Sequence, residues 1–148
     1  GGSLQTLLEK ERNHEAPPDY NNTAKQIILC GIAHGMMVLH KNHVINRDLK
    51  PHNILINNDF KPLITDFGLS KFYDTQNSQY QSKCTIGTYA YMAPEVISDT
   101  NFNIKADVYA FGILMYEFVT GSDAIENIMN NKEFNAFELG FKLVSSFG

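Results

Sequence analysis

The longest run of regularly spaced apolar residues lies in the first third of the chain and predicts a helix. Asn21, Asn22 and Thr23 are candidate N-caps, and the pattern continues to about His40. The positions that recur at steps of three and four are Ile28, Ile32, Gly35, Met36 and Leu39. This spacing predicts one buried helix face. Because Gly31 and Gly35 carry no side chain, they predict that another element packs closely against this helix.

Shorter patterns surround the long helix. Residues 4–10 predict a short helix before it. Residues 54–56 and 60–65 are two apolar runs separated by turn-forming residues at 57–59, which predicts a small β-hairpin. Residues 68–91 are rich in Ser, Thr, Gln and Asn, so we expect a long irregular loop there.

The second half of the chain is expected to be helical around one buried element. Residues 106–120 are apolar on nearly every side, which is typical of a buried helix, and Gly121 is a candidate for its C-terminal stop. Further helices are predicted over 93–98 and within 133–144. Together the elements predict an α+β fold that is mostly α-helical and has one small hairpin.

Composition and charge agree with a single globular domain. The chain has 148 residues, of which 43% are hydrophobic and 19% are charged, and its net charge is -4. The negative charge argues against a nucleic-acid partner, and no apolar run reaches the roughly 18 residues of a membrane span. Cys30 lies in an apolar run, where we expect it in the core, and Cys84 lies in a polar one. Their spacing favours neither a disulfide framework nor a zinc site, so we expect a reducing, cytoplasmic environment.

The residues that carry chemistry gather around the predicted hairpin. The loop at 46–53 places the carboxylate of Asp48, the ammonium of Lys50 and the carboxamide of Asn53 within six residues. Asp66 follows thirteen residues after Asn53, at the end of the second predicted strand. Because both loops leave the same hairpin, these oxygen ligands are expected to converge, and they are of the kind that Mg²⁺ takes. Lys50 would add a point charge for a phosphate.

These residues resemble the signature of the protein kinase family. The 46–53 segment is similar to the catalytic loop of that family, and Asp66-Phe67-Gly68 is similar to the metal-binding motif that follows it. Three other segments complete the resemblance: Gly1-Gly2-Ser3-Leu4, Ala93-Pro94-Glu95 and Asp107-Val108-Tyr109-Ala110-Phe111-Gly112. The resemblance covers essentially the whole chain. It implies that residues 1–148 are part of a kinase domain, its C-terminal lobe, with an activation segment over 66–95.

The resemblance implies a role for each site residue. Asp48 would accept the proton of the substrate hydroxyl, and Lys50 would neutralise charge on the transferred phosphoryl group of ATP. Asn53 and Asp66 would hold Mg²⁺, and Leu55 would pack against the adenine ring. Asp48, Lys50 and Asn53 are thus the candidate catalytic residues, and Leu55, Lys50, Asn53 and Asp66 are the candidate cofactor-binding residues.

Two features bear on the substrate and on regulation. Lys50, two places after Asp48, resembles the serine/threonine form of the loop, and Thr88 sits where such kinases place a hydroxyl near both residues. The run 87–95 is similar to the tyrosine-kinase-like group, so we expect a protein Ser/Thr substrate. Arg47 before Asp48 implies control by an upstream kinase through a phosphate on the activation loop. The candidate phosphorylation sites are Thr75, Ser78, Ser82 and Thr85.

Several of these residues also have plain structural interpretations. Asp48 and Lys50 are also compatible with an ordinary loop carboxylate and a solvated surface charge, Asp66 with a turn cap, and Asn53 with a residue that satisfies only backbone groups. Asp107 is expected to bond the backbone of the 46–53 loop from a helix N-terminus. Five further residues are expected to have structural roles: Glu95 pairing with an arginine, His34, His40 and His43 at the surface or in the fold, and Phe67 in the core.

The chain also departs from the family pattern. Asn46 stands where the family has a histidine that packs behind Asp66-Phe67-Gly68, which is expected to loosen packing and impair activity. The Gly-rich phosphate loop and strand lysine of the N-terminal lobe, and the last helices of the C-terminal lobe, are not among the 148 residues. We therefore expect a kinase whose segment is inactive alone. The alternative is a non-catalytic, pseudokinase-like module that binds partner proteins.

Overall fold

The computed structural model describes residues 2–67, 70–72, 90–93 and 103–121. The helices and strands follow each other in this order: β1 (Gly2–Ser3), α1 (Leu4–Arg12), α2 (Asn22–Lys41), β2 (Val44–Ile45), the 3₁₀ turn η1 (Pro51–Asn53), β3 (Ile54–Ile56), β4 (Pro62–Ile64), β5 (Lys71–Phe72) and α4 (Ile104–Thr120). Of the helix predicted over 93–98 the structure describes only residue 93, and the helix predicted within 133–144 lies wholly outside the described residues. None of the helices described is both long and apolar enough to cross a bilayer.

The ends of the two long helices are set by side-chain and backbone caps. Asn21 Oδ1 accepts a hydrogen bond from the backbone N–H of Thr23 at 2.9 Å, so the predicted N-cap of α2 is confirmed. Asn103 does the same for α4 through the N–H of Lys105 at 2.8 Å. Gly121 ends α4 with a φ of 67°, a left-handed conformation that glycine adopts without steric cost.

The strands form two small antiparallel sheets. β3 lies between β1 and β4, and Leu55 of β3 stands opposite Leu63 of β4. The predicted hairpin is confirmed, but its second strand is shorter than the expected 60–65. The reason is the turn, in which Asn57 bonds the N–H groups of Phe60 and Lys61, so regular pairing starts only at Pro62.

The second sheet pairs β2 with β5 and corrects one expectation. Residues 68–91 were expected to be irregular throughout, yet Lys71 stands opposite Ile45 and Phe72 opposite Val44. A two-residue strand has no internal periodicity, and its pairing is created by the distant strand it meets. This pairing brings the chain after Asp66 back beside the start of the 46–53 loop.

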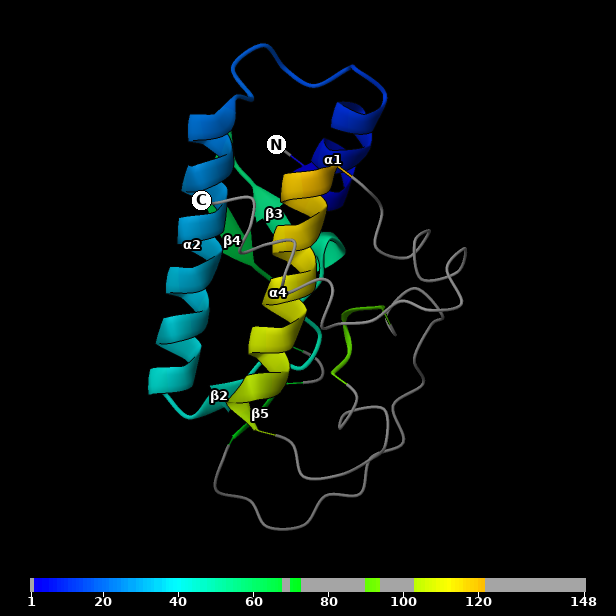
Figure 1. The fold of residues 1–148 in the computed structure, drawn as a ribbon. Helices are drawn as coiled ribbons and strands as arrows, with labels where there is room; N and C mark the ends of the chain where they lie inside the picture. Colours follow the sequence, from blue (N-terminus) through cyan, green and yellow to red (C-terminus); the bar gives the residue numbers. More distant parts are fainter. Residues whose placement is uncertain (1, 68–69, 73–89, 94–102, 122–148) are drawn as a thin grey trace, which may run out of the picture.

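The core forms between α2, α4, α1 and the three-stranded sheet. Figure 1 shows α2 and α4 side by side and running in opposite directions, with β3 and β4 behind them. The buried face of α2 consists of Ala24, Ile28, Ile32 and Met36, which agrees with the predicted face. α4 contributes Ile113, Leu114 and Phe118 to the same core. The antiparallel arrangement sets the C-terminal end of α2 against the N-terminal end of α4.

Two expected core residues are exposed. Cys30 lies on the outer side of α2, because it falls between the buried positions Ile28 and Ile32 in the helical repeat. Phe67 is 49% exposed. It follows Asp66, whose φ of 59° turns the chain at the end of β4, so the ring does not continue the buried side of the strand. Both expectations were therefore wrong.

The predicted close approach to α2 is made by β4. A Cβ atom at Gly31 would lie 2.5 Å from both Cγ and Cδ of Pro62, and one at Gly35 would lie 3.0 Å from Cδ1 of Ile64. Contacts of 2.5 Å are not tolerated between carbon atoms, and the Pro62 ring is rigid. The glycines therefore let α2 pack directly against the hairpin that carries the end of the candidate site.

We expect Gly31→Ala and Gly112→Ala to change stability in opposite directions. Gly31→Ala forces α2 away from Pro62 and should destabilise the fold by about 1–3 kcal/mol. At Gly112 in α4, none of the described atoms lies within 4 Å of an added Cβ, so the gain in helix propensity, up to about 1 kcal/mol, should dominate. Urea denaturation of both variants measures the difference, and equal effects would contradict the close-packing argument.

Candidate functional site

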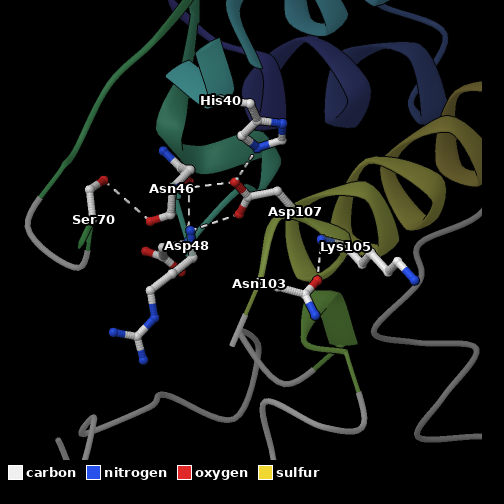
Figure 2. Close-up of polar contacts among 8 residues, drawn as sticks. His40, Asn46, Asp48, Ser70, Asn103, Lys105 and Asp107 are labelled. Carbon is white, nitrogen blue, oxygen red and sulfur yellow. Dashed lines mark hydrogen bonds and ion pairs between the residues drawn. The ribbon is translucent and has the colours of Figure 1, made fainter. Parts of the chain in front are cut away.

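The 46–53 loop begins directly after β2 and is anchored there by one buried carboxylate. Asp107, only 1% exposed in the first turn of α4, accepts hydrogen bonds from the N–H of Asn46 and the N–H of Arg47, each at 2.8 Å. His40, in the last turn of α2, contacts the same carboxylate through Nε2 at 2.8 Å. Figure 2 shows Asp107 reaching from α4 toward both His40 and the loop. The expected bond from Asp107 to the loop backbone is confirmed.

Asp107 anchors the loop at the residue whose backbone conformation is least favourable. Arg47 has a φ of 69°, in the left-handed region that costs a residue with a side chain about 1–2 kcal/mol. The charge-assisted bond from its N–H to Asp107 offsets that cost. The strained residue is the one directly before Asp48, so the anchor sets the direction in which the chain enters the site.

Asp48, Lys50 and Asn53 meet in one cluster. Lys50 Nζ lies 3.0 Å from Oδ1 and 2.8 Å from Oδ2 of Asp48. Asn53 Nδ2 donates to Asp48 Oδ2 at 2.8 Å and to the Asp48 backbone carbonyl at 3.0 Å. Asp48 and Asn53 are each 8% exposed, and Lys50 is half-buried, so the bonds from Lys50 and Asn53 hold the carboxylate in one orientation.

The end of the hairpin is tied to this cluster through Asn53. The Thr65 N–H donates to the Asn53 carbonyl at 2.8 Å, and the Thr65 hydroxyl donates to the same oxygen at 3.1 Å. Asp66 is the next residue, is exposed and has a φ of 59°. The backbone of Asp66 therefore lies one residue away from a contact with the 46–53 loop, and the convergence of the Asp66 carboxylate with Asp48 and Asn53 stays a prediction.

The oxygen atoms of Asn53 and Asp66 at the end of the hairpin are suitable ligands for a hard divalent cation such as Mg²⁺. Because Asn53 turns its amide nitrogen toward Asp48, the planar carboxamide directs its oxygen away from that residue. That oxygen and the Asp66 carboxylate are ligands of the kind Mg²⁺ takes, and Mg²⁺ is commonly held by one or two protein ligands together with substrate phosphates. Among the described residues, no three His, Cys, Asp or Glu side chains form a metal-binding group of their own.

Leu55 lies on the outer face of the three-stranded sheet. It is 44% exposed, whereas its neighbours Ile54 and Ile56 are buried, as strand alternation requires. Its register partner Leu63 is also exposed. The two leucines form an apolar platform on the outer face of the sheet, which is the type of surface on which a flat aromatic ring packs.

Sequence reasoning missed three contributors to the site. His40 was expected at the surface or in the fold; its contact with the anchoring carboxylate agrees with a role in the fold, but this partner was not predicted. Asn46 was read only as a departure, and Ser70 was not singled out, although its hydroxyl donates to the Asn46 carbonyl at 3.3 Å. An Asn two residues before Asp48 is a sequence signal for a side-chain turn, and Asn46 Oδ1 does accept a hydrogen bond from the N–H of Asp48 at 3.1 Å. Other predicted residues lie outside the described part of the chain: Thr75, Ser78, Ser82, Cys84, Thr85, Gly87, Thr88 and Glu95.

Known proteins similar to this chain are kinases. SD1-1, a G-type lectin S-receptor-like serine/threonine-protein kinase of Arabidopsis thaliana, is 42% identical over 97 residues, which is 64% of this chain and 12% of that protein. Cysteine-rich receptor-like protein kinase 6 of Oryza sativa subsp. japonica is 40% identical over 124 residues, 81% of this chain and 17% of the relative. Probable serine/threonine-protein kinase PBL23 of Arabidopsis thaliana is 38% identical over 138 residues, 90% of this chain and 35% of the relative.

The match to a protein family extends over nearly the whole sequence. The chain spans between 12% and 35% of the length of these three relatives. Residues 1–145 match the family described as protein kinase domain. The helices and the small antiparallel sheet described above are therefore those of a kinase domain, and the chain belongs to the protein kinase family.

Proposed function

We propose that the protein carrying this chain is a serine/threonine protein kinase that transfers the γ-phosphate of ATP to a protein hydroxyl. The observation that carries the proposal is the cluster of Asp48, Lys50 and Asn53, in which one oriented carboxylate is bonded by an ammonium and a carboxamide. The family match and the serine/threonine kinases among the relatives support the same reaction.

Each residue of the cluster has a proposed task. The Asp48 carboxylate orients the substrate hydroxyl and accepts its proton as the phosphoryl group is transferred. Lys50, which lies beside Asp48, is proposed to stabilise negative charge on that group. Asn53 holds Asp48 through Nδ2, and its oxygen and the Asp66 carboxylate are the proposed ligands of Mg²⁺. When bound, Mg²⁺ neutralises the phosphates and orients them for in-line transfer.

The exposed leucine platform supports the proposed position of the nucleotide. Leu55 would contact the adenine ring, with Leu63 beside it, because both side chains face away from the core. We further propose that these residues form the C-terminal lobe of the domain, with the catalytic loop over 46–53 and the activation segment over 66–95. The small hairpin beside a helical core supports this assignment. By this proposal residues 1–148 alone do not transfer phosphate.

The test is phosphate transfer by the full-length protein that carries this chain. Radiolabelled γ-phosphate from Mg-ATP should appear on Ser- or Thr-containing peptides and not on matched peptides that carry Ala at those positions. Omitting Mg²⁺ should remove the signal. The absence of transfer, in a preparation whose folding is verified, would contradict the proposal.

The second candidate function is a binding module without catalysis, which Asn46 at the histidine position favours. Nucleotide binding separates the two candidates. Because a ligand that binds only the folded state stabilises it, Mg-ATP at about 100 times its Kd should stabilise a kinase by about 2.7 kcal/mol. A binding module that takes no nucleotide should show no change in melting temperature, and it should show no transfer in the radiolabel assay.

A further inference from the structure

Asn46 is held at three points in the interior of the site. Its N–H donates to Asp107 Oδ2 at 2.8 Å, and its carbonyl accepts from the Ser70 hydroxyl at 3.3 Å. Its side-chain oxygen Oδ1 accepts from the N–H of Asp48 at 3.1 Å. Asn46 is 0% exposed, and its bonds with Asp107 and Asp48 are buried, whereas the bond with Ser70 is partly buried. Figure 2 shows Asn46 between Asp107, Ser70 and Asp48.

The bond from Asn46 to Asp48 repeats a local motif that this chain uses elsewhere. Asn21, Asn57 and Asn103 each accept a hydrogen bond from the N–H two residues later, at 2.9, 3.0 and 2.8 Å. An Asn side chain in this motif closes a turn that imitates a backbone turn. At those three positions the motif is exposed and begins a helix or closes the hairpin turn. At Asn46 it is buried, and the residue it fixes is Asp48.

The two polar atoms of the Asn46 side chain contribute unequally. The atom facing the Asp48 N–H must be the oxygen, because that N–H can only donate. The amide nitrogen Nδ2 is buried and makes no hydrogen bond with any described residue. Leaving a buried donor unpaired is unfavourable. The side chain of Asn46 therefore makes one polar contact with the described residues, the hydrogen bond that Oδ1 accepts. An apolar side chain of similar shape removes only that hydrogen bond.

We infer that Asn46 is a positioning residue that sets the backbone, and hence the carboxylate, of Asp48. This inference rests on the proposed kinase function. It adds a role to the expected loosening of packing, which stays a prediction: at this position the Asn side chain bonds the neighbouring backbone directly. Ser70 binds the carbonyl of the same residue, so Asn46 also joins the orientation of Asp48 to the strand pairing of β2 with β5.

Three variants of the full-length protein separate hydrogen bonding from volume. Asn46→Leu keeps the γ-branched shape, with a larger volume, and removes the acceptor. Asn46→Ser removes volume but keeps a hydroxyl acceptor that closes the same turn more weakly. Asn46→Ala removes both. Asn57→Leu is the matched control, because it breaks the same motif in the hairpin turn, away from Asp48.

We expect kcat to depend on whether the side chain at position 46 can accept a hydrogen bond, and not on its volume. Asn46→Leu and Asn46→Ala should lower kcat by about 10- to 100-fold, as a misplacement of about 1 Å does, with little change in the KM for ATP. Asn46→Ser should retain more activity than Asn46→Leu, and Asn57→Leu should retain the unaltered kcat. If Asn46→Leu is as active as the unsubstituted protein, or Asn46→Ser is as impaired as Asn46→Ala, the inference is overturned.

Amide hydrogen exchange at Asp48 gives a readout that does not need activity. The Asp48 N–H should exchange faster in Asn46→Leu than in the unsubstituted protein, and Asn46→Ser should restore part of the protection. If the unsubstituted protein transfers no phosphate but shows this pattern, the proposed function fails and the positioning of Asp48 by Asn46 stands. Unchanged protection of Asp48 in a folded Asn46→Leu variant would overturn the inference even in an active kinase.

Discussion

Asp48→Asn is expected to lower kcat for phosphate transfer by about 10²- to 10⁴-fold, which is the usual contribution of a positioned general base. The carboxamide has nearly the same shape and can still accept a hydrogen bond from Lys50 or Asn53. It cannot accept the proton of a hydroxyl, and it has no charge to pair with the Lys50 ammonium. The loss should therefore fall on the transfer step, with a much smaller effect on the KM for ATP.

The measurement is steady-state transfer from Mg-ATP by the full-length protein, with kcat and KM determined separately. Asp59→Asn is the matched control. Asp59 is an exposed carboxylate in the hairpin turn, so this substitution makes the same chemical change remote from the cluster. Both variants should melt close to the unsubstituted protein. Equal kcat values for Asp48→Asn and Asp59→Asn would remove Asp48 from the mechanism.

Asp107→Ala is expected to destabilise the fold by about 3–5 kcal/mol. Removing the carboxylate leaves the N–H groups of Asn46 and Arg47 without their acceptor in the interior, and it also removes the contact with His40. Each buried donor that loses its partner costs about 1–3 kcal/mol. Asp107→Asn should be destabilising but less severe, since one carbonyl oxygen remains for one of the two N–H groups.

Urea denaturation of the two Asp107 variants tests this expectation. Val108→Ala is the control, because Val108 is the next residue of α4 and is more than half exposed, so its truncation should change stability by less than about 0.5 kcal/mol. If Asp107→Ala is too unstable to purify, Asp107→Asn still allows the comparison. An Asp107→Asn variant as stable as Val108→Ala would show that the anchor of the loop lies elsewhere.

Local sequence patterns predicted most of the described elements because those elements depend on neighbours in the chain. The repeat of Ile28, Ile32 and Met36 follows one face of a single helix, so its buried side could be predicted without knowing what covers it. The cap at Asn21 and the stop at Gly121 are likewise contacts within a few residues. The cluster of Asp48, Lys50 and Asn53 spans one short loop, which made it recognisable from the sequence.

The errors concern contacts between distant segments. Phe67 has an apolar side chain, but the turn of the backbone at Asp66 leaves it half exposed. The strand at Lys71 and Phe72 exists only because β2 lies beside it. Neither result can be predicted from hydrophobicity within a window of a few residues, since each depends on where another segment lies.

The sequence by itself determined the described helices and the hairpin, because these follow from periodicity, capping and spacing along one stretch of chain, and its motifs indicated the family and the residue types of the candidate site by resemblance. Only the tertiary structure decided how the site is held. It placed Asp107 and His40, sixty-seven residues apart, on one end of two antiparallel helices, where they anchor the loop. It also buried Asn46, and burial turns an ordinary local Asn turn into a water-shielded support for Asp48, since a hydrogen bond is stronger where water cannot compete for it.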